Sequence, residues 1–445
     1  MISTIDLRGT TPTARELRLL VPRAEVDVAG SMAQAAQLVE DVRDHGESAL
    51  KDQAEKFDGV RPEHVRVAPK RIAASLDKLR PNVRAALEES IRRVRAVSSA
   101  AMPIPISTEL AEGAIVAHRW RPMGRVGLYV PGGKAVYPSS VVMNAVPAQV
   151  AGVGSVAIAS PPQKEFGGEV HPVILAAAGL LGIDEVYAMG GPGAIGAFAY
   201  GVPELELEPV DLITGPGNVW VAAAKRVVRG VVGIDAEAGP TEILIIADDS
   251  ADAVLVAADL VSQAEHDELA AAVLVTDSDG FAGRVRAELG LLAESARKGT
   301  RVRAAIDGRQ SAIVLVDSLE QAAAFSNAYG PEHLELQVRG PETLLASISN
   351  AGAIFLGEDS PVSLGDYLAG SNHVLPTGGQ ARFASGLGVH TFLRPQQVIS
   401  YDRGALGAVR AHISALATAE DLPAHADAVT ARFRGETTDG AHAVP

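Results

Sequence analysis

The sequence predicts an α/β protein built on two parallel sheets, and three observations support this fold class. From Val126 onward, short β-branched runs alternate with Ala-rich helical stretches, which is the pattern of βαβ units. The chain has 445 residues, more than a single hydrophobic core usually serves. Hydrophobic residues make up 47% and charged residues 21%, as in globular proteins. We therefore expect two to four structural units.

The expected strands fall into two groups of four. The first group is VGLYV at 126–130, GSVAIAS at 154–160, EVYAMG at 185–190 and VDLIT at 210–214. The second is EILIIAD at 242–248, AAVLVTD at 271–277, SAIVLVD at 311–317 and AGAIFLG at 351–357. Each run is short, apolar and bounded by turn residues, as expected of buried parallel strands. The Gly239-Pro240 step between the groups predicts a hinge between two sheets.

The remaining segments predict helices. Apolar residues recur at helical spacing from Met32 to Phe57 and again after Pro81, while no strand pattern follows about Ala381. We expect an N-terminal helical arm at 1–24, one discontinuous α/β domain at 25–128 and 240–381, a second at 129–239, and a small helical C-terminal domain with a disordered tail at 382–445.

Composition limits the function. The net charge of −15 opposes nucleic-acid binding, which needs a basic surface. The absence of cysteine excludes disulfides, thiolate metal sites and a thioester intermediate. The N-terminus does not resemble a secretory signal, and no apolar run is long enough to span a membrane. We expect a cytoplasmic protein without nucleic-acid or membrane partners.

Three glycine turns follow expected strands: Pro131-Gly132-Gly133, Gly191-x-Gly193-x-x-Gly196 and Gly215-Pro216-Gly217-Asn218. Each turn alone could be structural, and the acidic residue that usually accompanies G-x-G-x-x-G is not evident. Glycine lets the backbone approach a ligand closely, and a helix N-terminus attracts phosphate. Turns at the ends of neighbouring strands together favour a nucleotide or dinucleotide site.

Candidate metal ligands lie in three segments, as Gln263 with His266, Asp366 with His373, and Glu420 with His425. Gln263 and His266 are three residues apart, so on a helix they would share a face. A surface helix, a polar turn and a solvated helix are the respective alternatives. Because thiolates are absent, Gln, His and Asp side chains form the pool of possible ligands for a metal such as zinc.

The stretch AYGPEHLEL places an acid, Glu332, beside an imidazole, His333. Consecutive side chains serve one reacting centre only if the backbone turns there, and Gly330-Pro331 predicts such a turn. The alternative is a helix start, with Pro in the first turn and Glu near the positive end of the helix.

Taken in order, these motifs resemble the histidinol dehydrogenase family. The matching stretches are GLYVPGG, GPGN, AGPTE, SQAEHD, YGPEHLEL, GDYLAGSNHVLPTGG and AEDLPAH, which run from about residue 25 to 431. The resemblance implies two incomplete Rossmann-like domains with two small domains, in a homodimer with one Zn²⁺ per subunit. It also implies oxidation of L-histidinol to L-histidine through the aldehyde, with two NAD used in turn.

The resemblance further implies roles for individual residues. Glu332 and His333 are the expected catalytic pair. The expected zinc ligands are Gln263, His266, Asp366 and His425, with His425 and Glu420 supplied by the partner subunit. The same zinc ligands, together with Thr241, His333, His373 and Glu420, are expected to line the substrate site, and Tyr129 and Asn218 to contact NAD. Gly193 stands where the family often has Gln, so a side-chain contact to NAD is expected to be lost there.

Residue chemistry agrees with these roles. His333 suits a general base for alcohol oxidation, because imidazole titrates near neutrality. Without cysteine, oxidation of the aldehyde needs water as nucleophile, and Glu332 can activate it. Zinc is redox-inert and is expected to orient the substrate. The rival interpretations are a zinc hydrolase acting on a small nitrogenous substrate and a non-catalytic nucleotide-binding or assembly protein.

Overall fold

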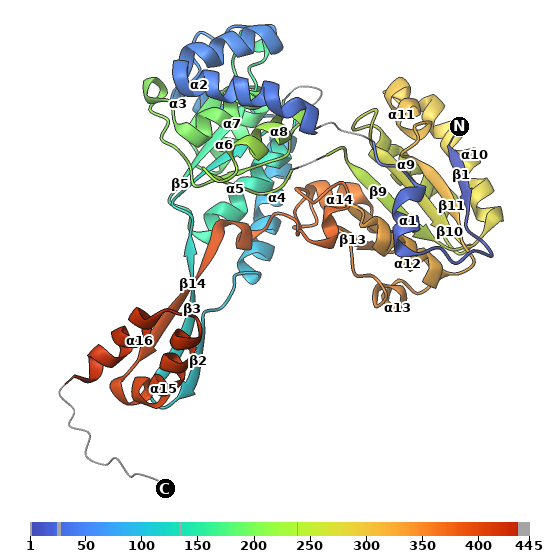
Figure 1. The fold of residues 1–445 in the computed structure, drawn as a ribbon. Helices are drawn as coiled ribbons and strands as arrows, with labels where there is room; N and C mark the ends of the chain where they lie inside the picture. The colour runs from blue at the N-terminus through green and yellow to red at the C-terminus, as the bar shows by residue number, and fades with distance from the viewer. Residues whose placement is uncertain (1, 25–27, 133–135, 238, 435–445) are drawn as a thin grey trace. The chain divides into compact units, whose positions relative to one another are not determined.

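A computed structural model describes residues 2–24, 28–132, 136–237 and 239–434 (Figure 1). The chain divides into two compact units. The first unit contains residues 1–102 and 122–392, and the second contains residues 103–121 and 393–445. Residues 435–445, the tail expected to be disordered, and Gly133 of the first glycine turn lie outside the described residues.

The described strands are β1 Ser3–Asp6, β2 Ile106–Ala111, β3 Ala114–Pro122, β4 Arg125–Tyr129, β5 Ser155–Ser160, β6 Val186–Ala188, β7 Leu212–Thr214, β8 Gly233–Ile234, β9 Glu242–Ala247, β10 Ala271–Thr276, β11 Ala312–Leu315, β12 His333–Gln337, β13 Ala353–Leu356 and β14 Leu393–Tyr401. The described helices are α1 Ala14–Leu20, α2 Val28–Phe57, α3 Pro69–Asp77, α4 Pro81–Ala100, α5 Pro138–Ala151, α6 Pro172–Leu180, α7 Gly191–Tyr200, α8 Val219–Val228, α9 Ala253–Ala264, α10 Asp279–Ser295, α11 Gly299–Ile306, α12 Leu319–Tyr329, α13 Pro341–Leu345, α14 Val362–Tyr367, α15 Arg403–Ala419 and α16 Pro423–Thr430. The α/β class and the helical C-terminal region predicted from the sequence are confirmed.

A six-stranded parallel sheet in the first unit has the order β1-β11-β10-β9-β12-β13. Alternate side chains of β9 enter two different cores. Ile243 and Ile245 pack with residues of α9, α10 and α11, whereas Leu244 and Ile246 pack with residues of α1 and α12. This alternation makes a helix–sheet–helix sandwich, because a parallel strand is buried on both faces.

A five-stranded parallel sheet, also in the first unit, has the order β6-β5-β4-β7-β8. Tyr129 and Tyr187 lie in one core with residues of α7 and α8. Gly127 of β4 lies against the ring of Phe198 in α7, where a Cβ would come within 2.6 Å of that ring. The helix can therefore pack closely on the sheet only because residue 127 has no side chain.

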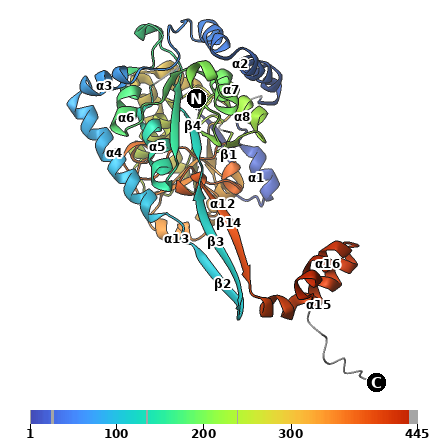
Figure 2. The same cartoon turned by 90° about the vertical axis from the view of Figure 1, so that its left-hand side faces the viewer.

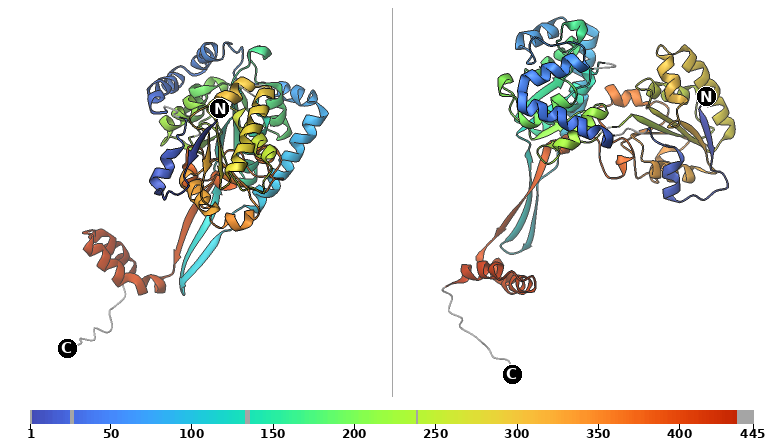
Figure 3. Two further views of the ribbon diagram at one scale, coloured as in Figure 1. Left: turned by 90° about the vertical axis from the view of Figure 1, so that its right-hand side faces the viewer. Right: turned by 45° about the horizontal axis from the view of Figure 1, so that its top comes forward.

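Helices α2, α3 and α4 pack against the helices around the five-stranded sheet. Helix α2 contacts α7 and α8, α3 contacts α6, and α4 contacts α5 (Figures 2 and 3). The expected domain boundaries joined residues 25–128 to 240–381, whereas α2, α3 and α4 contact the helices around the five-stranded sheet. They also treated residues 1–24 as a separate arm, whereas β1 pairs with β11 inside the six-stranded sheet. Helical periodicity shows which face of a helix is buried, but it does not identify the sheet that the face covers.

The second unit contains a three-stranded sheet of order β14-β3-β2, with α15 packed against α16. The expectation that no strand follows residue 381 was wrong, since β14 lies at 393–401. Strands β2 and β3 were also not expected. Their side chains are mostly exposed, so they lack the apolar runs that identified the buried strands.

The helix-start alternative for Glu332 and His333 was wrong. Helix α12 ends at Tyr329, and Gly330 caps it with φ 60°, in the left-handed region that favours glycine. The chain then enters β12, which pairs in parallel with β9 and β13. The predicted turn is present, and it places Glu332 immediately before the first residue of a central buried strand.

In the described ranges, no helix combines the length and the apolar character needed to span a membrane.

The turn after β7 depends on the absence of a side chain at Gly215. Gly215 has φ 113°, and a Cβ there would lie 2.0 Å from the carbonyl oxygen of Tyr129. Its N–H donates to Asp235, and its carbonyl accepts from the buried Lys225 ammonium. We expect Gly215→Ala to lower the thermal unfolding midpoint strongly, because the clash adds to backbone strain of about 1–3 kcal/mol.

Gly230→Ala is the matched control for this prediction. Gly230 has a similar φ of 106° with open space around it, so alanine there introduces the backbone strain without the clash. Calorimetry should show the larger decrease for Gly215→Ala. Equal decreases would show that the contact with Tyr129 does not restrict the turn.

Candidate active site

A cavity of roughly 970 Å³ in the first unit joins the edges of its two sheets. Glycine turns beyond the carboxyl ends of β4, β6 and β7 line one part, including Gly132, Gly190 and Gly215. Thr241, which precedes β9, and the Glu332–His333 pair at the start of β12 line another part. The carboxyl edge of one sheet thus shares a cavity with the amino edge of the other.

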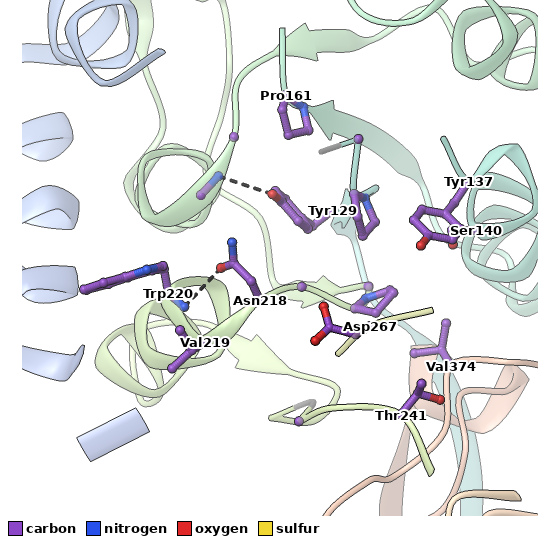
Figure 4. A pocket seen from close by; sticks show the side chains of 18 of the residues that line it. Tyr129, Tyr137, Ser140, Pro161, Asn218, Val219, Trp220, Thr241, Asp267 and Val374 are labelled. Atoms are coloured by element: carbon purple, nitrogen blue, oxygen red, sulfur yellow. Dashed lines mark hydrogen bonds between the residues drawn. The ribbon is translucent and has the colours of Figure 1, made fainter. Parts of the chain in front are cut away.

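The glycine-turn part of the cavity contains Tyr129 and Asn218. The Tyr129 hydroxyl accepts a hydrogen bond from the Gly191 N–H at 3.3 Å, at the first residue of α7 (Figure 4). The Asn218 side chain caps α8 by accepting from the N–H groups of Trp220 and Val221 at 3.1 and 3.2 Å. Both side chains therefore mark helix N-termini, where backbone N–H groups favour an anion.

Gly193 does not line the cavity; it lies buried in the first turn of α7. A Cβ at Gly193 would come within 2.6 Å of the Gln53 side-chain oxygen, because α2 packs there. Gln53 itself lines the cavity. The space beside residue 193 is thus occupied by a glutamine from another helix, which a larger residue at this position would displace.

The backbone of Glu242, the first residue of β9, fixes both members of the expected catalytic pair. Its N–H donates to Glu332 Oε2 at 2.8 Å, and its carbonyl lies 3.0 Å from His333 Nδ1. A carbonyl oxygen only accepts, so Nδ1 carries the proton of a neutral His333 ring and Nε2 keeps its lone pair. The imidazole and the carboxyl group are therefore both held by the Glu242 backbone, with His333 Nδ1 and Glu332 Oε2 3.5 Å apart.

Burial shifts the pKa values of these two groups in opposite directions. Glu332 is 5% exposed and His333 is 4% exposed. Burial raises the pKa of Glu332 well above its usual value, against the opposing hydrogen bonds from Thr241 and Glu242. Burial lowers the pKa of His333, although the nearby Asp366 carboxylate partly offsets the change. Burial thus favours the neutral form of both groups.

Thr241 connects Glu332 to Gln263. The Thr241 hydroxyl donates to Glu332 Oε2 at 2.6 Å, and it accepts a hydrogen bond from the Gln263 side-chain nitrogen. Because that nitrogen donates to Thr241, the Gln263 amide oxygen remains free to accept or to bind a cation. This short relay fixes the orientation of both end groups.

His266 and Asp366 also line the cavity. His266 follows the end of α9, so it does not share a helix face with Gln263; its N–H instead donates to the Gln263 carbonyl at 3.2 Å. Burial lowers the pKa of His266, and the Asp366 charge opposes this change. Within the described ranges, no hydrogen bond reaches the His266 ring or the Asp366 carboxylate, so both keep free lone pairs in the cavity.

His373 is held by two neighbours. Its Nδ1 lies 3.0 Å from the Asp366 carbonyl, and its Nε2 lies 3.1 Å from the Ser140 hydroxyl at the start of α5. Burial lowers its pKa. These contacts tie the loop after α14 to α5, so His373 lines the site as an already hydrogen-bonded ring.

Glu420 and His425 belong to the second unit. Glu420 caps the end of α15, His425 lies in α16, and both are exposed. In the part of the chain that the structure describes, no three His, Asp or Glu side chains are grouped to hold a metal. Two of the four expected ligands, His266 and Asp366, line the cavity. The other two are Gln263, whose donor would be an amide oxygen, and His425 of the second unit.

Two contributors to the site were not predicted from the sequence. Glu242 acts through its backbone, for which a sequence carries no direct signal. Ser140 contacts His373 from the first turn of α5. The sequence indicated only that this residue lies just beyond the first glycine turn. Both were missed because they depend on how distant elements pack.

The fold and the site together define an α/β protein in which an acid–base pair and a set of glycine turns line one cavity. The model of the family described as histidinol dehydrogenase matches residues 21–433. A histidinol dehydrogenase of Leifsonia xyli subsp. xyli is 67% identical over 97% of this chain and 99% of its own length. That of Thermobifida fusca is 56% identical over 98% of both chains. The chain belongs to the histidinol dehydrogenase family.

A solved structure supports the same assignment. The crystal structure of histidinol dehydrogenase from Elizabethkingia anophelis superimposes with a TM-score of 0.90 at 32% identity, covering 97% of this chain and 98% of that chain. The similarity therefore extends over nearly the whole fold.

Proposed function

We propose that this chain oxidises L-histidinol to L-histidine through L-histidinaldehyde, using two NAD, as the last step of histidine biosynthesis. Membership of the family supports the substrate and the pathway. The observation that carries the chemistry is the anchoring of Glu332 and His333 on the backbone of Glu242. Two proton-handling groups at one place suit two successive oxidations.

In the first oxidation, His333 takes the proton of the substrate hydroxyl as the carbonyl forms. Its Nε2 is suited to this, because Nδ1 is engaged with Glu242 and the lowered pKa keeps the ring neutral. NAD, when bound beside Tyr129 and Asn218, would supply the acceptor for the hydride that leaves the same carbon. The products are the aldehyde, reduced NAD and one proton.

In the second oxidation, water adds to the aldehyde and a second hydride leaves from the hydrate. Glu332 is the base for this water, and no cysteine is present to form a thioester. The raised pKa of Glu332 means that the carboxyl group must first lose its proton. A positive charge bound in the cavity favours that loss, and the hydrogen bonds from Thr241 and Glu242 then stabilise the carboxylate.

We further propose one Zn²⁺ per subunit, in a homodimer. Gln263, His266 and Asp366 would hold the ion, with His425 from a second copy of this chain. The free lone pairs of His266 and Asp366 and the free amide oxygen of Gln263 fit such a site, since nitrogen and oxygen donors suit zinc. When bound, zinc would orient the substrate without carrying electrons.

The remaining assignments follow from the cavity and the family. Tyr129 and Asn218 would contact NAD, whereas Gly193, the third expected cofactor residue, is buried in α7 and does not line the cavity. The substrate would contact Thr241, Gln263, His266, His333, Asp366, His373, Glu420 and His425, with Glu420 also supplied by the second copy. The net charge of −15 supports a cytoplasmic enzyme without nucleic-acid or membrane partners.

A reduced-cofactor absorbance assay with L-histidinol and NAD tests the proposed function. We expect two reduced NAD for each histidine formed, and loss of activity with a chelator that added zinc restores. A hydrolase would consume substrate without reducing NAD, and a non-catalytic protein would do neither. Either result would remove the proposal.

Glu332→Gln should impair oxidation of L-histidinaldehyde by about 10²- to 10⁴-fold, the usual contribution of a general base. The amide keeps the shape and the hydrogen bonds accepted from Thr241 and Glu242, but it cannot take a proton. In the wild type, the acid limb of the aldehyde step should lie above the usual range of a carboxyl group, because burial raises the pKa of Glu332. The alcohol step should keep its rate to lower pH than an ordinary histidine would allow, because burial lowers the pKa of His333.

Stopped-flow measurement of each half-reaction over a pH series checks this prediction. The variant should lose the acid limb of the aldehyde step, while the alcohol step keeps its own acid limb because His333 is intact. An unimpaired aldehyde step would show that Glu332 is not the base.

His425→Ala should reduce zinc occupancy and turnover, because a tetrahedral site would lose one of its four ligands. Metal analysis of the dialysed protein measures the occupancy. His412→Ala is the control, since His412 is an exposed histidine of α15 in the same unit. Equal zinc content in both variants and the wild type would remove His425 from the ligand set.

A further inference from the structure

The last two turns of α2 form part of the cavity wall. Leu50, Gln53, Ala54, Phe57 and Asp58 all line it. Leu50, Gln53, Ala54 and Phe57 are three, one and three residues apart, which places them on one helical face, and Asp58 follows the last residue of α2. This face belongs to a helix outside the βαβ units that supply the glycine turns.

Asp58 presents a carboxylate without a partner. No hydrogen bond or ion pair reaches it within the described ranges, and no described residue that lines the cavity is Lys or Arg. Burial raises its pKa to about 6, so at neutral pH it is mostly an anion that accepts hydrogen bonds. The carbonyl groups at the C-terminus of α2 add negative potential there.

Gln53 supplies a second acceptor on the same face. It is 7% exposed, and its nitrogen donates to the Leu38 carbonyl at 2.9 Å. Its Oε1 is buried and has no hydrogen-bond partner. An unsatisfied buried oxygen is costly unless a ligand or water supplies a donor.

The location of these acceptors indicates which part of a dinucleotide they meet. Burial and the charge of Asp58 together raise the pKa of Tyr129 to about 12, which places Asp58 near that tyrosine, whose hydroxyl accepts from the first residue of α7. The Gln53 side-chain oxygen lies beside Gly193 in the first turn of the same helix. Both acceptors therefore lie near the N-terminal turn of α7, in the glycine-turn part of the cavity.

We propose that Asp58, with Gln53 beside it, binds the hydroxyl groups of the adenosine ribose and selects NAD over its 2′-phosphorylated form. This inference rests on the proposed use of NAD. A ribose 2′-hydroxyl donates a hydrogen bond to a carboxylate, whereas a 2′-phosphate brings like charges together. Strand β5 ends in Ser160-Pro161-Pro162 and offers no acid. Asp58, at the end of α2, thus takes the role of the acidic residue that the second strand of a dinucleotide-binding fold usually supplies.

Calorimetric titration of the full-length protein with NAD and with NADP tests the proposal without measuring turnover. The wild type should bind NAD and discriminate against NADP. Asp58→Asn should bind NADP about tenfold or more tightly than the wild type does, because repulsion between like charges is removed. Asp58→Glu should keep the discrimination, since it keeps the charge.

Asp44→Asn is the matched control. It makes the same chemical change on the exposed surface of α2, away from the cavity, so the ratio of NAD to NADP affinity should stay at the wild-type value. A wild-type ratio in a folded Asp58→Asn would overturn the inference and leave the proposed function intact. Absence of NAD binding to the wild-type protein would overturn both.

Discussion

The backbone of Glu242 is the constraint on which the site depends. Its N–H and carbonyl hold Glu332 and His333 at once, and this is possible because β9 and β12 are adjacent parallel strands, with His333 opposite Ile243. Glu332 precedes the paired residues, so its side chain does not follow the alternation of the strand. The Glu242 side chain is itself fixed by Arg23 and by the Gly378 N–H at 3.2 Å. Consecutive residues can therefore serve one reacting centre.

The two sheets contribute opposite edges to the cavity. Ligands of open α/β sheets usually bind beyond the carboxyl ends of the strands, and the glycine turns after β4, β6 and β7 follow this rule. The acid–base pair lies at the amino ends of β9 and β12 instead. An amino edge presents strand N–H groups, such as that of Glu242, which stabilise a carboxylate. The six-stranded sheet thus holds the acid–base pair, while the glycine turns of the five-stranded sheet suit phosphate groups.

The sequence was sufficient for what depends on local patterns. All eight expected strands are present, because buried parallel strands are apolar runs between turn residues, and the cavity contains the glycine turns and Thr241, His266, Asp366 and the Glu332–His333 pair. Strand β12 was missed because acidic and basic residues interrupt it, and β14 because it is exposed. The position of α2 over α7 and α8 could not be predicted, since periodicity identifies a buried face but not its partner. For that reason Asp58 carried no signal in the sequence.

The charge of the cavity connects these features. Asp58, Asp235, Asp267, Glu332 and Asp366 line it, and the described lining contains no Lys or Arg. Of these, Asp235 is paired with the buried Lys225. Burial raises the pKa of Asp58 and Glu332, and the described lining has no Lys or Arg side chain to compensate. Cationic ligands supply that compensation. A nicotinamide ring, a protonated amine and a divalent metal are all cations, so each would favour the carboxylate form of Glu332. In the proposed function, binding of a cationic ligand and deprotonation of Glu332 would therefore favour each other through charge.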